Sequence, residues 1–372
     1  MTFKQCSVCV MDTTDPDINF DDKGICNHYY RYKEQLASRI HLNNTQKKLQ
    51  TIIEKIKSSN KHGDYDCVIG ISGGVDSTYI AYLVKQYSLN PLAVHFDNGW
   101  NSELAVQNIE HTLKILDIDL YTYVMDWETF KEIQKAFLCA STPDGEIPTD
   151  HAINSVLYQV AVKFGIKYII NGMNFKTESI AVSRWAYGHS DWRYIKGICK
   201  HFNVKSLKGY PHFSLFNLMY YLIFKKIKVI SILNYIDYNK NEAMHILKSK
   251  LNWQYYGGKH YESIYTRFYQ SYILPKKFNI DKRKIHYSDL IFSKQMTKDE
   301  ALKLLKKPTC DPDLQEEDKE FVLKKLSLTQ KQFDDIMNLQ IKSYSDYQNN
   351  ASFVFALKKI YNRLRKIGFV SK

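Results

Sequence analysis

The sequence lacks a hydrophobic run long enough to cross a bilayer. Residues 213–224 are apolar and aromatic, but Asn217 interrupts the run and Lys225 and Lys226 follow it. A stretch of about twelve residues is too short, because about 20 are needed to span the hydrocarbon core. We therefore expect no membrane span. The segment is interpreted as a buried helix, with an interfacial membrane helix as the alternative.

A secretory signal and a disulfide framework are also missing. Residues Met1–Cys6 do not have the pattern of a signal peptide. The seven cysteines are spread along 372 residues, and some are isolated in positions expected in the core. Both observations indicate a cytoplasmic location in which the thiols stay reduced.

The sequence has no long block of Lys or Arg, no internal repeat and no low-complexity tract, although its formal net charge is +13. A positive balance favours anionic partners, and nucleotides or nucleotide sugars explain it as well as nucleic acid would. A solvated basic surface without a ligand is the alternative. The length suggests two domains with a small appendage.

The loop at residues 72–77 is the most informative part of the chain. It follows a short apolar run, 68–71, and precedes a helical pattern, which predicts a buried strand, a tight turn and a helix. Free amides at the helix start, with the hydroxyls of Ser72 and Ser77, would bind anionic oxygens. Asp76 would repel phosphate unless a divalent cation lay between them. The loop consists of Ser72, Gly73, Gly74, Val75, Asp76 and Ser77.

This loop resembles the pyrophosphate loop (PP-loop) of ATP pyrophosphatases, which cleave ATP between its α- and β-phosphates. It is not a kinase-type P-loop, because the Gly-Lys-Ser/Thr ending is absent. An ordinary glycine-rich turn between a strand and a helix is the alternative.

Apolar runs alternate with helical patterns along the next hundred residues. We expect strands at 91–97, 120–125 and 168–171, and helices at 103–116, 127–138 and 151–164. The alternation predicts an α/β fold with a doubly wound parallel sheet. Ligands of such sheets bind at the carboxyl ends of the strands. Polar segments at 97–101, 141–150 and 171–178 are expected to meet there and form a shared site.

Three cysteines lie close to the start of the sequence. Cys6 and Cys9 are followed by Cys26, a spacing that supplies most of a zinc site, which normally has four ligands. Zinc ribbons close with a second pair, but Tyr29 stands at the position of its last member. His28 is the candidate fourth ligand, and three incidental thiols are the alternative.

The patterns divide the chain into four regions. Residues 1–32 are a Cys-rich, zinc-ribbon-like segment, 33–63 linker helices, 64–180 an ATP-binding α/β domain, and 181–372 a mainly helical substrate or partner domain.

Several segments together resemble the N-acetyl sugar amidotransferases of bacterial surface-polysaccharide (lipopolysaccharide) and flagellin-glycan biosynthesis. The segments are 6–16, 72–77, 95–101, 234–239, 257–262, 268–270, 274–278 and 281–284. The resemblance spans most of the chain up to Leu305. Tyr29 departs from it, because the family commonly has cysteine at this position.

The resemblance implies ATP-dependent conversion of an acetamido group on a nucleotide-linked sugar into an acetamidino group. An amide carbonyl is a poor electrophile and its oxygen a poor leaving group. Transfer of AMP to that oxygen would give an imidate to which ammonia could add, with AMP departing. Magnesium would neutralise the leaving pyrophosphate.

The resemblance also implies roles for particular residues. Asp76 and Glu178 would bind Mg²⁺, since 174–178 is similar to the Asn-x-x-x-Glu of NAD synthetase-like enzymes. Lys259 or Arg267 would stabilise phosphate charge. The nucleotide contacts are expected from the PP-loop with His95, Phe96, Asp97, Asn171 and Gly172. Candidates for sugar binding or proton transfer are Asp150 and His151. An ordinary surface ion pair is the alternative for each charged residue.

The chain offers no glutaminase nucleophile. Cys139 and Cys199 lack the Gly-x-Cys-x-Gly context of such a site. Ammonia is therefore expected from solution or from a partner. The resemblance implies a glutaminase subunit and a barrel-type ammonia-conducting subunit.

Two other classes of protein could contain a loop like 72–77. A tRNA-modifying ATP pyrophosphatase would use the basic charge, although charge alone is weak evidence for nucleic acid. A non-catalytic nucleotide-binding scaffold is the second alternative. Under the preferred interpretation no nucleic acid is bound.

Overall fold

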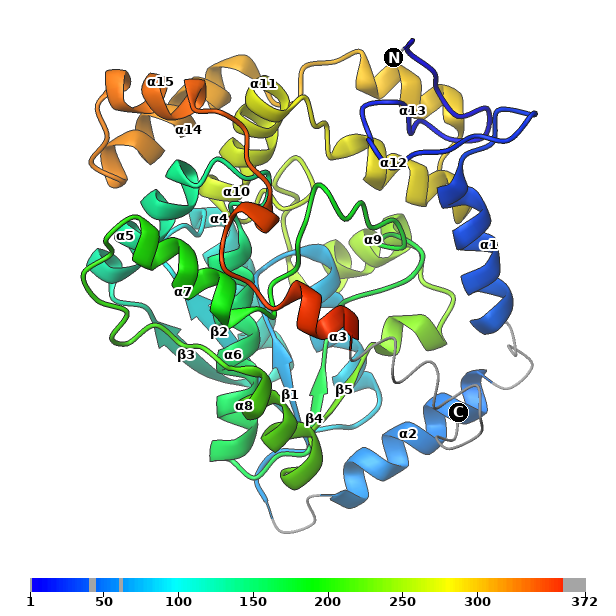
Figure 1. The fold of residues 1–372 in the computed structure, drawn as a ribbon. Coiled ribbons are helices and arrows are strands. Elements are labelled where there is room, and N and C mark those ends of the chain that lie inside the picture. Colours follow the sequence, from blue (N-terminus) through cyan, green and yellow to red (C-terminus); the bar gives the residue numbers. More distant parts are fainter. Residues whose placement is uncertain (1, 40–44, 60–62, 357–372) are drawn as a thin grey trace.

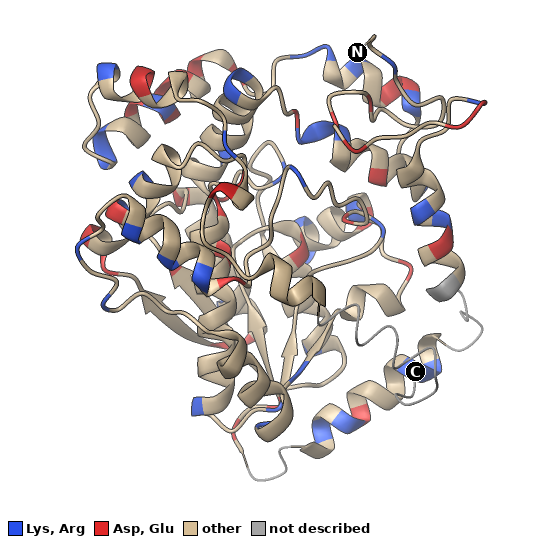
Figure 2. Cartoon of the chain, viewed as in Figure 1, with Lys and Arg blue, Asp and Glu red and all other residues tan. Residues whose placement is uncertain are grey.

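A computed structural model describes residues 2–39, 45–59 and 63–356 of the chain (Figure 1). Parts of the expected linker (40–44 and 60–62) and of the expected C-terminal domain (357–372) lie outside the described residues. No described helix is both long enough and apolar enough to cross a membrane. Figure 2 shows Lys and Arg distributed over many elements, as the sequence predicted.

A five-stranded parallel sheet lies at the centre of the fold. The strand order is β3-β2-β1-β4-β5. The strands are β1 (Cys67–Gly70), β2 (Pro91–Asp97), β3 (Asp119–Val124), β4 (Tyr168–Ile170) and β5 (Lys228–Ile230). In the register, Val68 of β1 lies opposite Leu92 of β2 and Ile169 of β4. The short apolar runs became strands because both faces of the sheet are covered.

Helices cover each face, so the doubly wound α/β fold predicted from the sequence is confirmed (Figure 1). Successive side chains of a strand point to opposite faces. Ile69 and Ile170 pack in one core with α2 (Thr45–Ser59), α3 (Val75–Gln86), α4 (Glu103–Leu116) and α9 (Lys240–Leu251). Val68 and Ile169 pack in the other core with α5 (Trp127–Cys139), α6 (Ile147–Lys163) and α7 (Trp192–His201).

The rest of the described chain is mainly helical. Its helices are α1 (Asn27–Arg39), α8 (Leu215–Met219), α10 (Ile264–Phe268), α11 (Leu274–Phe278), α12 (Arg283–Phe292), α13 (Lys298–Leu305), α14 (Pro312–Lys325) and α15 (Gln330–Asn338). Two π-helical turns continue α8 and α10, at Tyr220–Phe224 and Tyr269–Ile273. Asp311 caps α14 by accepting hydrogen bonds from two of its first amides.

The N-terminal segment lies against α12 and α13 (Figure 1). Lys284 of α12 forms an ion pair with the buried Asp12, with 2.6 Å between Nζ and Oδ2. Lys298 of α13 donates to the carbonyl oxygen of Cys6 at 2.6 Å. Two elements far away in sequence therefore hold the cysteine-containing segment in place.

Three details differ from the sequence-based expectations. Helix α6 begins at Ile147 rather than His151, since Pro148 is compatible with a first helical turn. Strand β5 was not predicted, and its three residues extend the sheet beyond residue 180. The interpretation of 213–224 as a buried helix is wrong. Most side chains of α8 and of the π-helical turn after it are exposed, and Tyr221 is the buried exception.

Candidate functional site

The loop between β1 and α3 is closed by its own side chains. Gly74 donates its amide to Ser72 Oγ at 3.3 Å, and Ser77 Oγ donates to the Gly74 carbonyl at 3.2 Å. The Ser72 amide donates to Ser77 Oγ. Trp253 Nε1 donates to the Gly73 carbonyl at 2.9 Å, which joins the loop to the segment after α9. The serine pair predicted to bind anionic oxygens therefore faces inward across one turn.

Gly73 is required by its backbone and by its surroundings. Its φ is +78°, and a Cβ atom there would lie less than 3.0 Å from the backbone oxygen of Ala105 on α4. Side chains other than glycine rarely adopt such a φ. Only glycine lets the loop pass this close to α4.

An amide of the loop points at a tyrosine hydroxyl. The Val75 amide donates to Tyr256 Oη at 3.2 Å. Tyr256 comes from the segment after α9, and a Cβ atom on Gly74 would lie 3.3 Å from both Tyr256 Oη and Glu262 Oε1. An amide at a helix start that donates to an oxygen atom is suited to an anionic oxygen of a phosphate. Displacement of the Tyr256 hydroxyl would free it for that purpose.

Two carboxylates and a lysine lie next to the loop. Lys259 Nζ donates to Glu178 Oε1 at 3.0 Å, and Tyr238 donates to Asp76 Oδ1. Burial, followed by repulsion from Glu178, raises the pKa of Asp76. Burial alone would raise the pKa of Glu178, but attraction to Lys259 outweighs it and the pKa is lowered. The sequence expected Asp76, Glu178 and Lys259 in one site, and the structure brings them together.

Asp76 and Glu178 are brought together because the ends of two neighbouring strands approach each other closely. A Cβ atom on Gly172, just after β4, would lie 3.1 Å from the backbone carbon of Asp76. Asp289 of α12 fixes the chain after Glu178 by accepting from the amides of Ser179 and Ile180, both at 3.2 Å. The loops after β1 and β4 therefore meet, as predicted for neighbouring parallel strands.

Lys240 at the start of α9 is the second cation of the site. Burial lowers its pKa, and Asp76 acts in the opposite direction. Burial likewise lowers the pKa of Lys259, but Glu178 and Asp76 outweigh it and the net shift is upward. Lys259 is therefore the more firmly charged of the two lysines.

Two hollows with shared lining residues border the site. The smaller, of about 200 Å³, includes the loop, Gly172 and Glu178. The larger, of about 740 Å³, extends toward α12 and the chain around Pro308. Both include Lys240, Tyr256 and Lys259. The larger hollow is also lined by Tyr255, Tyr261, Lys282, Arg283, His286 and Lys307.

His286 of α12 lines the larger hollow together with several Lys and Arg side chains. Burial, followed by repulsion from Lys259, lowers its pKa well below the ordinary value. Its ring centroid lies 5.8 Å from that of His260. The His286 imidazole is therefore uncharged at neutral pH among cationic neighbours.

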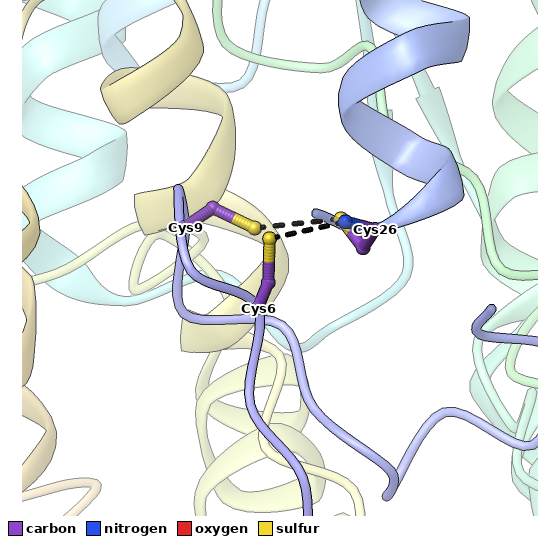
Figure 3. Close-up of side chains that lie close together, drawn as sticks. All are labelled: Cys6, Cys9 and Cys26. Atoms are coloured by element: carbon purple, nitrogen blue, oxygen red, sulfur yellow. Dashed lines mark hydrogen bonds between the residues drawn. The ribbon is translucent and has the colours of Figure 1, made fainter. Parts of the chain in front are cut away.

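The three N-terminal cysteines converge, as the sequence predicted. Their sulfur atoms lie within 4.8 Å of one another, and all three residues are fully buried (Figure 3). Cys9 Sγ and Cys26 Sγ are 3.7 Å apart, and the Cys26 amide donates to Cys6 Sγ at 3.3 Å. A tetrahedral zinc with sulfurs at about 2.3 Å places them about 3.8 Å apart. The three thiols therefore fit three corners of such a site.

The candidate fourth ligand is not part of this group. Among the described residues, no His, Cys, Asp or Glu atom beyond the three sulfurs completes a cluster of that size. His28 Nε2 bonds instead to the buried Asp15 Oδ2 at 2.6 Å. Tyr29 packs edge-to-face on Phe292 of α12. The fourth corner is left without a protein ligand from the part of the chain that the structure describes.

Two other predicted residues are engaged elsewhere. Arg267 forms a bidentate ion pair with Asp318, with both N–O distances 2.6 Å, although it also borders the larger hollow. His151 is buried, its Nδ1 donates to the His189 carbonyl at 2.6 Å, and its Nε2 accepts from the Phe213 amide. Burial lowers the pKa of His151 to about 4. The structure leaves no ring nitrogen of His151 free for a substrate.

Asp150 is exposed in the first turn of α6. Protein nevertheless surrounds it on several sides, so that desolvation, followed by repulsion from Glu146 and Asp144, raises its pKa to about 7. It does not line the hollow at the loop.

The residues expected around the adenosine mainly shape the ends of strands. His95 bonds to the Ile71 carbonyl through Nδ1 at 2.9 Å, and Asn171 accepts from Ser231 Oγ at 2.7 Å. Phe96 packs in the core beside Tyr123 and Phe130. The Asp97 carboxylate accepts the Gly99 amide at 2.8 Å and so holds the turn after β2.

The sequence reasoning missed four residues of the site: Tyr238, Lys240, Tyr256 and His286. Tyr238 lies within 234–239, one of the segments that carried the resemblance, and Tyr256 directly precedes another, 257–262. These segments therefore held a usable signal. Lys240 directly follows 234–239 and had the same signal. His286 lay outside all these segments, because only the fold brings α12 to the larger hollow.

Comparison with known proteins gives one family match. Residues 262–365 match the family described as "LPS biosynthesis protein WbpG-like, C-terminal domain". The match includes Arg267 and His286 but not the loop at 72–77.

Two curated proteins are similar to parts of the chain. One is "Uncharacterized protein MJ1599" of Methanocaldococcus jannaschii, 29% identical over 174 residues, which are 45% of this chain and 58% of that protein. The other is the tRNA-specific 2-thiouridylase MnmA of Chlamydia abortus, 25% identical over 145 residues, 34% of this chain and 40% of that protein. The chain thus spans about half the length of the curated relatives it matches.

Solved structures show a more distant likeness. A predicted subunit of tRNA methyltransferase from M. jannaschii has a TM-score of 0.29 and 17% identity, covering 48% of this chain and 72% of that one. NMN synthetase from Francisella tularensis has a TM-score of 0.29 and 16% identity, covering 54% and 94%. NH3-dependent NAD synthetase from Campylobacter jejuni has a TM-score of 0.28 and 17% identity, covering 56% and 93%. These scores single out no particular structural relative.

Proposed function

We propose that this protein is an ATP-dependent N-acetyl sugar amidotransferase of surface-polysaccharide or flagellin-glycan biosynthesis. It converts the acetamido group of a nucleotide-linked sugar into an acetamidino group, releasing AMP and pyrophosphate. The observation that carries the proposal is the meeting of the 72–77 loop, the Asp76–Glu178 pair and Lys259 beside a large basic hollow. The match of residues 262–365 to a lipopolysaccharide biosynthesis family supports the biological setting.

The first chemical step activates the amide. The acetamido oxygen attacks the α-phosphorus of ATP, the bond between the α-phosphorus and the bridging oxygen breaks, and pyrophosphate leaves with that electron pair. The amides of the loop and Lys259 offset the negative charge on the leaving group. The product is an imidate carrying AMP on its oxygen.

The second step replaces that oxygen by nitrogen. Ammonia adds to the imidate carbon, one N–H proton is lost to a base, and AMP departs with the former acetamido oxygen. His286 is the neutral base available in the larger hollow. The reaction consumes one ATP and one ammonia for each acetamidino group formed.

A divalent cation fits the loop side of the site. Asp76 and Glu178 repel each other, and Mg²⁺ is held in proteins by one or two carboxylates together with substrate phosphates. When bound, Mg²⁺ would neutralise the leaving pyrophosphate. Asp76 and Glu178 would hold it, and Lys259 would keep Glu178 ionised.

The larger hollow is the place for the sugar substrate. A nucleotide-linked sugar carries a diphosphate and an aromatic base, which suit a hollow lined by Lys240, Lys282 and the rings of Tyr255 and Tyr287. Because this hollow joins the loop hollow at Lys259, the acetamido group would lie next to the α-phosphate. The C-terminal region thus acts as the substrate domain.

Ammonia comes from a partner in this proposal. The described cysteines are buried or isolated, and none has the setting of a glutaminase nucleophile. A glutaminase subunit with a barrel-type ammonia-conducting subunit would deliver ammonia at neutral pH. Zinc bound by Cys6, Cys9 and Cys26 would be structural, since their segment lies on α12 rather than at the loop.

An oxygen-transfer experiment tests the proposal most directly. The full chain is incubated with ATP, Mg²⁺, ammonium and a panel of nucleotide-linked acetamido sugars labelled with ¹⁸O in the acetamido group. Exchange of O for NH lowers the mass of the unlabelled sugar by about one dalton, and the label should appear in AMP. Amidination with the label in water or phosphate would contradict the adenylation route. No AMP formation with any sugar of the panel would contradict the function.

The relative from C. abortus gives the competing function, modification of tRNA. Thiolation usually needs two reactive cysteines near the ATP site. Among the described residues, the cysteine nearest in sequence to the loop is Cys67, which is buried in β1, and burial raises its pKa. ATP–pyrophosphate exchange that depends on tRNA rather than on an acetamido sugar would favour that function.

A further inference from the structure

We propose that residues 215–228 form a docking surface for an anionic lipid membrane, independently of the catalytic function proposed above. This surface, the apolar tip, consists of α8, the π-helical turn Tyr220–Phe224 and the residues up to Lys228. It lies beside the sheet edge that carries β5.

Large apolar side chains of the tip face solvent. Phe216 is 83% exposed, Phe224 75% and Ile223 58%, and Met219 and Leu222 are also exposed. Single exposed apolar residues are common, but a contiguous group of this kind marks an interaction site. The group extends without a charged residue from Leu215 to Phe224.

The exposed side chains of the tip belong to a segment that is packed on the rest of the protein. Tyr221 is buried and stacks on Tyr158 of α6, with 5.1 Å between ring centroids. Ile227 is buried just after the tip, and Ser214 caps α8 in a reciprocal capping box with Asn217. The tip is therefore held from both ends and through its middle, while its other apolar side chains project outward.

The sequence on both sides of the tip carries charge of one sign. The chain contains no Asp or Glu from Trp192 to Ile236. Its basic residues in this range are Arg193, Lys196, Lys200, Lys205, Lys208, Lys225, Lys226 and Lys228. Lys225, Lys226 and Lys228 directly follow the apolar residues and are exposed. Lysines beside an inserted apolar segment attract anionic headgroups.

The shape of the tip favours a lipid surface over a protein partner. Leu222, Ile223 and Phe224 are consecutive and all exposed. Consecutive residues of a helical turn point in different directions around its axis. A flat protein surface would contact one side of such a projection, whereas acyl chains can surround it. A second copy of this chain is the competing occupant, and the experiment below separates the two.

The test is co-sedimentation of the full chain with vesicles of two compositions. One contains phosphatidylglycerol mixed with phosphatidylcholine, and the other contains phosphatidylcholine alone. We expect binding to the anionic vesicles at low salt and weaker binding at high salt, because screening reduces the attraction of the lysines. Ile223→Ser combined with Phe224→Ser should lower the bound fraction about tenfold or more.

Two further variants complete the design. Replacement of Lys225, Lys226 and Lys228 by Gln should abolish the preference for anionic vesicles. Val106→Ser combined with Ile115→Ser is the matched control, because both residues are similarly half-exposed on α4. The control should bind like the wild type. All variants should keep the wild-type thermal midpoint and ATP–pyrophosphate exchange rate in solution, since the changed side chains lie outside the loop and the hollows.

Three outcomes would overturn the proposal. The wild type could fail to bind anionic vesicles better than neutral ones. The Ile223/Phe224 variant could bind as well as the wild type while remaining folded. The wild type could self-associate through the tip in gel filtration without binding either vesicle, which would assign the surface to a protein partner.

Discussion

Replacement of Asp76 by Asn should stabilise the protein while abolishing its activity. In the folded protein, burial and repulsion from Glu178 raise the pKa of Asp76. The ionised carboxylate therefore lowers the free energy of unfolding once the pH exceeds the ordinary aspartate pKa, about 3.9. Asparagine keeps the side-chain shape and an oxygen for the Tyr238 hydroxyl, but it carries no charge.

The direction of the shift fixes the sign of the effect. Because the folded protein disfavours the ionised carboxylate, its removal should raise the free energy of unfolding at neutral pH. The gain is read as a rise in the thermal midpoint, at about 2–4 °C per kcal/mol. The gain should disappear as the pH falls below about 4, where Asp76 is protonated in both folded and unfolded wild type.

The activity should change in the opposite direction. In the proposed mechanism Asp76 is a ligand for Mg²⁺, so its loss should lower AMP formation about a hundredfold or more. Thermal unfolding at pH 4 and pH 7 and sugar-dependent ATP–pyrophosphate exchange measure the two effects. Asp237→Asn is the matched control, because its exposed carboxylate pairs only with Lys176 and should affect neither. A variant of Asp76 that is less stable than the wild type, or that keeps normal exchange, would refute the reasoning.

Three further predictions concern the glycine loop, the cysteines and the source of ammonia. Gly73→Ala should abolish soluble folding or ATP–pyrophosphate exchange. Gly165→Ala is the control, because Gly165 has a similar φ but no neighbouring atom within 4 Å, and it should lower the free energy of unfolding by only about 1–2 kcal/mol. Equal effects of the two variants would show that the contact with α4 is unimportant. Protein purified without chelators should contain zinc. Cys9→Ser should bind no zinc, and its thermal midpoint should be several degrees lower. If the wild-type protein contains no transition metal and its thiols are reduced, the cysteines form no metal site. The isolated chain should use ammonium with a rate that rises with pH, because the fraction of free ammonia rises, and it should not use glutamine until a glutaminase partner is added. Glutamine-dependent amidination by the chain alone, measured by mass spectrometry, would contradict the last prediction.

The parts of the site that are local in sequence were predicted well. The loop 72–77 was recognised because glycine, serine and an apolar strand follow one another, and this pattern depends only on nearby residues. Cys6, Cys9 and Cys26 were expected to converge for the same reason, and their sulfurs do so. His151 shows the limit of this approach. Its neighbourhood in sequence resembled a site, but aromatic rings from α7 and the chain after it enclose it.

The exposed tip and the extra strand show the same limit on a larger scale. An apolar run of this length is buried when another element covers it, and the sequence contains no local sign that Phe213 and Tyr221 are covered while Phe216 and Phe224 are exposed. The three residues of β5 are too few to be recognised, and they form a strand because β4 offers an unpaired edge. Both features depend on what lies beside the segment after folding.

By itself, the sequence determined the α/β architecture, the turn at 72–77 between a strand and a helix, and the cysteine group, because each follows from periodicity, glycine geometry or close spacing. Only the tertiary structure decided that Lys240 and Tyr256 join Asp76, that His286 borders the larger hollow, that Arg267 is paired with Asp318, and that the tip is exposed. Helices α9, α10 and α12 are separated from the loop by more than 150 residues. Their positions depend on the packing of whole helices, which short sequence patterns do not predict.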